Sequence, residues 1–90
     1  MRMFRGILKR ERGSGEFHGT LSLIDDNGIQ FMSDDGNVAI KDPMAVASVL
    51  EDGNVRVDGY GLFHVKSELP VTASNVRTTV AVVPVKLGTK

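Results

Sequence analysis

Polar and apolar side chains alternate most clearly along residues 16–24. Phe17, Leu21 and Leu23 fall on one side of an extended chain, and His18 falls on the other. A repeat of two residues is typical of a β-strand that has one face in the core and one face in water. We therefore predict a strand over residues 16–24 whose phenylalanine and leucines enter the core.

Short clusters of Asp, Asn and Gly divide much of the chain into strand-length pieces. The clusters at 25–28 and 34–37 are typical of tight hairpin turns, because Asn and Gly tolerate positive φ. They predict a three-strand antiparallel meander that spans residues 16–41. The remaining strands are predicted from the same punctuation and from β-branched residues, at 3–10, 54–58, 62–66 and within 76–87.

The segment that follows Asp42 interrupts this strand pattern. Asp42 is a good helix N-cap, Pro43 is favoured at the first helical position, and mainly apolar residues follow as far as Leu50. We expect one short helix near 43–51. The predicted fold class is all-β and mainly antiparallel, a small barrel or sandwich of six to seven short strands with this helix, in a single domain over residues 1–90.

The composition favours a folded domain that lies inside the cell. Hydrophobic residues make up 41% of the 90 positions, which is enough to form a core. The absence of cysteine excludes disulfides and thiolate metal sites. Residues 1–12 do not form a signal peptide, and no apolar run approaches the roughly 20 residues that cross a bilayer. We expect a cytoplasmic protein, or a virion component if the source is viral.

Charge is distributed unevenly along a chain whose formal net charge is zero. Residues 1–12 hold five basic residues and one acidic residue, whereas residues 13–60 hold two basic and nine acidic residues. Residues 61–90 are basic again, with four basic residues and one glutamate. If the two ends lie together, the resulting dipole would steer a partner or favour ordered self-association. The other interpretation is ordinary variation among solvated surfaces.

The sequence lacks the residue patterns that are typical of catalysis or cofactor binding. The two histidines, His18 and His64, belong to no nucleophile motif. The acidic residues cluster in predicted turns, and no stretch matches the calcium-binding loop. The glycine pairs at 13–15 and 59–61 lack the spacing of phosphate-binding loops. We predict a protein that is not an enzyme, with no catalytic residues, no metal, no cofactor, no membrane contact and no small-molecule substrate.

The favoured hypothesis is an interaction or assembly module that binds a protein partner or a second copy through its terminal strands. The last predicted strand is apolar on both faces, with Val82 on one and Val85 on the other. Such a strand is covered either inside the fold, here by the short helix, or by a partner. A small viral structural, accessory or inhibitor protein would fit this description. The predicted contact residues are Arg5, Lys9, Arg10, Arg77, Val82 and Val85.

The alternative is a single-strand nucleic-acid-binding protein on an oligonucleotide-binding-like barrel. Such proteins combine a basic groove with exposed aromatic rings. The segments 61–63 (GLF) and 82–86 (VVPVK) resemble the end of filamentous-phage single-strand DNA-binding proteins. The resemblance covers a minor part of the chain, and the basic and aromatic pattern of that family does not continue through the rest. The contact residues for this alternative are Arg5, Lys9, Arg10, Tyr60 and Phe63.

Overall fold

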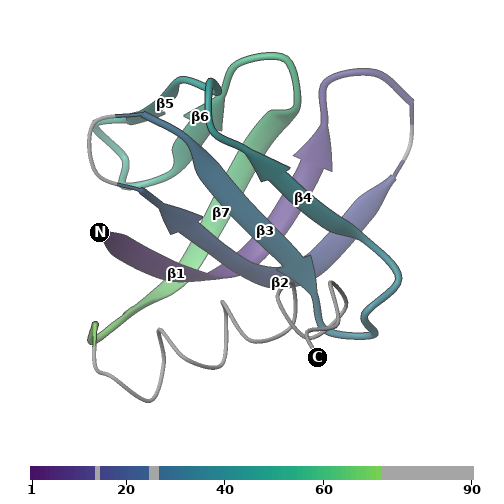
Figure 1. Cartoon of the computed structure of the whole chain (residues 1–90), viewed down its shortest axis with the longest axis horizontal. Coiled ribbons are helices and arrows are strands. Elements are labelled where there is room, and N and C mark those ends of the chain that lie inside the picture. The colour runs from purple at the N-terminus through teal and green to yellow at the C-terminus, as the bar shows by residue number, and fades with distance from the viewer. Residues whose placement is uncertain (14, 25–26, 72–90) are drawn as a thin grey trace, which may run out of the picture.

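A computed structural model describes residues 1–13, 15–24 and 27–71, and in this part of the chain seven strands form one antiparallel sheet. The sheet curls into a half-barrel, with the strands in the order β4-β3-β2-β1-β7-β6-β5 (Figure 1). The strands are β1 (Arg2–Arg10), β2 (Glu16–Leu23), β3 (Ile29–Ser33), β4 (Ala39–Asp42), β5 (Ala47–Val49), β6 (Val55–Val57) and β7 (Gly61–Leu69).

The all-β prediction and the predicted meander are confirmed. Strands β2, β3 and β4 pair sequentially and antiparallel. The turn between β3 and β4 forms as its composition indicates, since Gly36 has a φ of 78°. The Asp35 carboxylate accepts the backbone N–H of Asn37 at 2.9 Å. The composition of this turn therefore predicts its conformation correctly.

The predicted helix near 43–51 is wrong, because the chain turns there and then forms strand β5. Asp42 does accept the N–H of Met44 at 2.9 Å, as an N-cap would. The carbonyl oxygens of Ala45 and Val46, however, accept N–H groups from two other turns of the fold, at 3.0 and 2.9 Å. Backbone groups that a helix would pair internally thus pair with distant segments.

No helix long and apolar enough to cross a membrane is found among the described residues.

Strand β1 lies inside the sheet, although the sequence-based hypothesis assigns the partner contact to the terminal strands. It pairs with β2 on one side and with β7 on the other. The edges of the described sheet are β4 and β5. The last predicted strand, within 76–87, lies outside the described residues.

The core fills the concave face of the half-barrel with two cross-strand rows of apolar side chains. One row runs from β1 to β4, and the other runs from β2 through β1 and β7 to β6. The rows meet where the rings of Phe31 and Phe63 pack edge to face, with centroids 6.1 Å apart and planes at 72°. The first row is Phe4, Leu21, Phe31 and Ile40, and the second is Phe17, Leu8, Phe63 and Val55.

Candidate functional site

Arg5, one of the predicted contact residues, is already engaged within the fold. Its guanidinium donates two hydrogen bonds to the Asp34 carboxylate, at 2.6 and 2.9 Å, and a third to the Thr20 hydroxyl at 3.0 Å. The hydrogen bond from Arg5 is also the main reason why the pKa of Asp34 lies below its ordinary value. A bidentate pair of this kind uses the side chain to hold the β3–β4 turn against β1.

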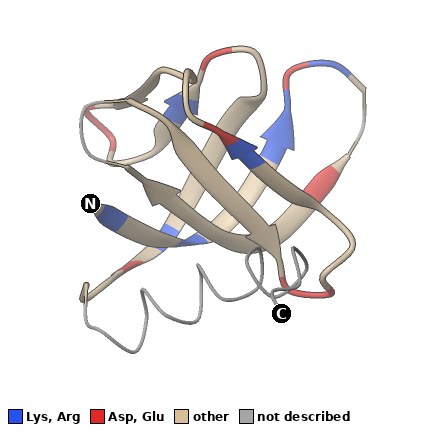
Figure 2. Cartoon of the chain, in the orientation of Figure 1, with Lys and Arg blue, Asp and Glu red and all other residues tan. Residues whose placement is uncertain are grey.

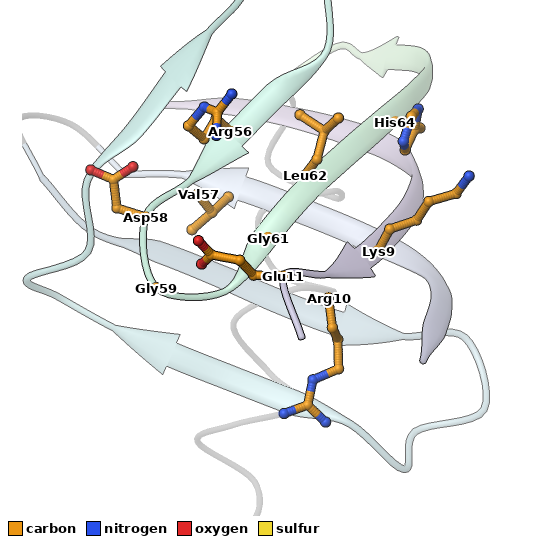
Figure 3. Close-up of a pocket in the computed structure, with 10 residues that line it drawn as sticks. All are labelled: Lys9, Arg10, Glu11, Arg56, Val57, Asp58, Gly59, Gly61, Leu62 and His64. Atoms are coloured by element: carbon orange, nitrogen blue, oxygen red, sulfur yellow. The ribbon is translucent and has the colours of Figure 1, made fainter. Parts of the chain in front are cut away.

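Lys9 and Arg10 lie at the carboxyl-terminal end of β1, where basic positions gather in Figure 2. As neighbours on a strand they point to opposite faces of the sheet, which Figure 3 shows directly. Lys9 lies on the outer face, with its ammonium group 3.9 Å from a Glu16 carboxylate oxygen. Arg10 forms no ion pair with any residue in the described part of the chain. The other predicted contacts, Arg77, Val82 and Val85, lie outside the described residues.

The two aromatic residues of the nucleic-acid alternative occupy different environments. Phe63 has no exposed surface and packs against Phe31, which corrects its expected place as a ring open to a base. Tyr60 is half-buried at the β6–β7 turn, and its hydroxyl donates a 2.7 Å hydrogen bond to Asp42. Of the five residues in that set, Arg10 and Tyr60 line one pocket, whereas Lys9 lies on the opposite face of the sheet.

A groove of about 410 Å³ crosses the outer face over β1, β6 and β7. Lys9, Arg56 and His64 stand around Leu62, and acidic side chains lie at the end near the β6–β7 turn (Figure 3). Arg56 was not among the contact residues predicted from the sequence. The signal was the alternation of Val55, Arg56 and Val57, which buries both valines and exposes the arginine. The groove therefore carries charges of both signs.

A second cavity opens at the mouth of the half-barrel, on the concave side of the sheet. Its volume is about 270 Å³. Arg10 is the one charged side chain among the described residues that line it, and the others are apolar or aromatic. We call it the mouth pocket, and its other lining residues are Leu8, Phe17, Val38, Ile40 and Tyr60.

The connection between β4 and β5, together with β5 itself, carries three of the four exposed large hydrophobic side chains in the described part of the chain. Among the described residues the exposed large hydrophobic side chains are Met44, Val46, Val49 and Val71, at 78%, 49%, 45% and 48% exposure. Three of these four lie in the segment Met44–Val49, which we call the 44–49 segment. A cavity of about 160 Å³ separates this segment from the β2–β3 turn. The 44–49 segment was expected to be helical, so the exposure of its apolar side chains was not predicted.

The described residues contain no group of three or more His, Asp or Glu side chains that could hold a metal ion. Comparisons with protein-family models, curated proteins and solved structures found no match to this chain. A functional proposal for this chain therefore rests on the contacts, charges and surface shape of its described residues. The features available are the mixed-charge groove, the mouth pocket and the 44–49 segment.

The hydrogen bond between Tyr60 and Asp42 closes the open side of the half-barrel. Asp42 is the last residue of β4, whereas Tyr60 lies in the turn between β6 and β7, on the other side of β1 in the sheet. The Tyr60 hydroxyl, followed by the Met44 N–H, lowers the pKa of Asp42 below its ordinary value. The same hydrogen bond raises the pKa of Tyr60. Each shift favours the protonation state that keeps the bond.

We expect stability to fall at both ends of the pH scale through this pair. Because the pKa of Asp42 is lowered, its contribution is complete above about 3.9 and is lost as the pH falls through the folded-state pKa. Because the pKa of Tyr60 is raised, its contribution is complete below about 10 and is lost as the pH rises through the folded-state pKa. Urea unfolding midpoints across the pH range measure both losses.

Tyr60→Phe is the matched variant, because it removes only the hydroxyl. The chain has a single tyrosine, so the ultraviolet absorbance of the phenolate also reports the pKa of Tyr60 directly. The variant should be less stable at neutral pH and should lose less stability at alkaline pH than the parent. A phenolate that titrates at the value of free tyrosine, with parallel pH profiles for the two proteins, would contradict the assignment.

Proposed function

We propose that this chain is a non-enzymatic assembly module that pairs with a second copy of itself through the 44–49 segment. The observation that carries the proposal is the exposure of Met44, Val46 and Val49 within six consecutive residues. Scattered surface hydrophobics need no explanation, but three large ones within six residues favour an interaction surface. The sequence-based hypothesis assigned the partner contact to the terminal strands. Because β1 lies between β2 and β7, the proposal assigns this contact to the 44–49 segment instead.

The 44–49 segment is suited to a second copy because it presents both a protrusion and a recess. Met44 is the most exposed of the apolar side chains, and methionine adapts readily to irregular cavities. The 160 Å³ cavity is lined in part by Val46 and Ala47 of the same segment. A surface that carries both features satisfies the self-complementarity of a two-fold contact, in which each copy contributes the same residues.

The free side of β5 strengthens the case for self-pairing. Strand β5 pairs with β6, and in the described part of the chain no strand pairs with its other side. Two copies of β5 placed antiparallel about Ser48 would set Ala47 opposite Val49 of the second copy. Backbone hydrogen bonds across such an edge need no special sequence motif. The formal net charge of zero also removes long-range repulsion between two copies.

Val46→Asp is expected to convert a dimer into a monomer. A carboxylate placed in an apolar contact costs several kcal/mol, so the dimerisation constant should weaken about a hundred-fold or more. Sedimentation equilibrium over a range of protein concentrations measures this directly. The parent dimer should persist at high salt, because the contact is apolar.

Val71→Asp is the matched control, since Val71 has the same residue type and the same exposure as Val46 but lies after β7. This variant should dimerise like the parent. A parent that stays monomeric at every concentration would refute the proposal. Loss of assembly in Val71→Asp with an unaffected Val46→Asp would move the interface to the carboxyl-terminal end of the chain.

Single-strand nucleic-acid binding has less support from the geometry. Arg56 and Arg10 form no ion pairs within the described residues, which favours an anionic partner. The rings of Phe4 and Phe63, however, are buried in the core and offer no face to a base. Oligonucleotide binding that weakens steeply with salt, measured on the monomeric Val46→Asp variant, would favour this second function.

A further inference from the structure

The mouth pocket is separate from the 44–49 segment and has the chemistry of a small ligand site. Its wall is formed by inner-face side chains of β1 and β2, by Val38 just before β4 and Ile40 within it, and by the Tyr60 ring. A mostly apolar concavity with few polar groups is the usual character of ligand pockets, which recur at the mouths of β-barrels. The pocket shares no lining residue with the 44–49 segment.

Arg10 supplies the one charge in this apolar wall. It lies on the same face of β1 as Leu8, which is 3% exposed, and its side chain is directed away from Lys9, Arg56 and His64 in Figure 3. It has no ion-pair partner among the residues that the structure describes. Guanidinium groups bind carboxylates through two parallel hydrogen bonds, so this position favours a carboxylate ligand.

The stem of Arg10 packs beside Gly15, and the Tyr60 hydroxyl is already engaged in a hydrogen bond. A Cβ atom added to Gly15 would lie 3.1 Å from the Phe17 ring and 3.2 Å from Cδ of Arg10, so both side chains pack closely against the Gly15 backbone. The Tyr60 hydroxyl donates its hydrogen bond to Asp42 and therefore offers the pocket its ring rather than a donor. The polar contact with a ligand thus falls to Arg10.

The volume of the pocket limits the size of its ligand. At about 270 Å³ it lies below the range of about 300–1,000 Å³ that holds drug-sized molecules. We propose that the mouth pocket binds a short aliphatic carboxylate, with its chain against Phe17, Val38 and Ile40 and its carboxylate on Arg10. The same chemistry occurs in a free short-chain acid and in the carboxyl-terminal residue of a polypeptide that ends in leucine.

Titration of the whole chain with hexanoate, followed by amide chemical shifts in NMR spectra, tests the site. Hexanoate should give saturable shifts at the amides of Phe17, Val38 and Ile40. Hexanol has the same chain without the charge. Its affinity for the pocket should be lower than that of hexanoate by about ten-fold or more. Arg10→Gln should weaken hexanoate by the same factor, whereas Arg12→Gln should not, because Arg12 does not line the pocket.

The source of the ligand is distinguished by a second pair of probes, N-acetyl-glycyl-leucine and its amide. Tighter binding of this acid than of hexanoate, with loss in the amide, would assign the pocket to polypeptide chain ends. The reverse order would assign it to free acids. Absence of saturable shifts, equal binding of hexanol and hexanoate, or unchanged binding in a folded Arg10→Gln variant would each overturn the proposal. Because Val46→Asp leaves the pocket intact, it should bind hexanoate normally, so this proposal stands or falls separately from self-association.

Discussion

Replacing Gly6 with alanine is expected to remove most of the stability of the domain. A Cβ atom at this position would overlap the backbone carbonyl oxygen of His64 in β7 and lie 2.9 Å from a ring carbon of Phe63. Gly6 lies in β1, which pairs on both sides, and the β1–β7 register shifts between Arg5 and Gly6. The obstacle is therefore strand backbone, which cannot rotate away as a side chain can.

The magnitude follows from what must move to admit the methyl group. Overpacking in a core costs about 1–3 kcal/mol when side chains can adjust, and displacement of a paired strand should exceed the upper end of that range. Natural domains have only about 5–15 kcal/mol of stability, and small domains lie toward the lower end. Urea denaturation followed by circular dichroism should show Gly6→Ala unfolding at a much lower urea concentration than the parent.

Gly36→Ala is the control for this experiment. Gly36 has a φ of 78°, and a Cβ atom there meets nothing within 4 Å. Its cost is therefore only the conformational penalty of about 1–2 kcal/mol for a left-handed residue with a side chain. Gly6→Ala should be clearly the more damaging of the two. If it is as stable as Gly36→Ala, the close approach of β1 and β7 is not as described.

The part of the fold that could be predicted from sequence is the part that local chemistry determines. Turn residues at 34–37 and alternation along residues 16–24 act within a few positions of the chain, and they predict the meander correctly. Leu21 is fully buried as its place in the alternation requires. The alternation does not hold throughout, because Ser22, on its polar side, is also fully buried.

The failures all concern interactions between residues that are distant in the chain. Asp42 followed by Pro43 favours a turn as readily as a helix start, and what decides between them is the pairing of Ala45 and Val46 with other turns. The central position of β1 depends on its pairing with β7, more than 50 residues later. No local pattern contains that information.

The candidate contact residues also combine features that the local sequence predicts with features that depend on distant strands. The sequence indicates that Arg5 and Arg10 are basic residues on one strand, but not that Asp34 neutralises only the first. The Arg5–Asp34 pair is set by the register of three strands, in which Arg5 lies opposite Thr20 and Thr20 lies opposite Met32. Arg10 extends beyond the last β1–β2 pair, so it remains available at the mouth of the half-barrel.

Phe63→Ala is expected to lower the free energy of unfolding by about 3–5 kcal/mol, the usual cost of removing a buried phenylalanine side chain. The Phe63 ring has no exposed surface, lies opposite both Leu8 and Val55, and packs edge to face on Phe31. Its removal therefore leaves a cavity where the two rows of the core meet. Equilibrium urea unfolding of the parent and the variant measures the difference.

Leu62→Ala is the matched comparison, because Leu62 immediately precedes Phe63 in β7 and is only half-buried on the outer face beside Lys9. Its substitution should cost clearly less, on the order of 1 kcal/mol. The contrast also separates two roles for Phe63. A ring that contacted a nucleic-acid base would be removed with little loss of stability and a large loss of binding, whereas a core ring gives the opposite result. Equal stability of Phe63→Ala and Leu62→Ala would place Phe63 outside the core and restore it as a ligand contact.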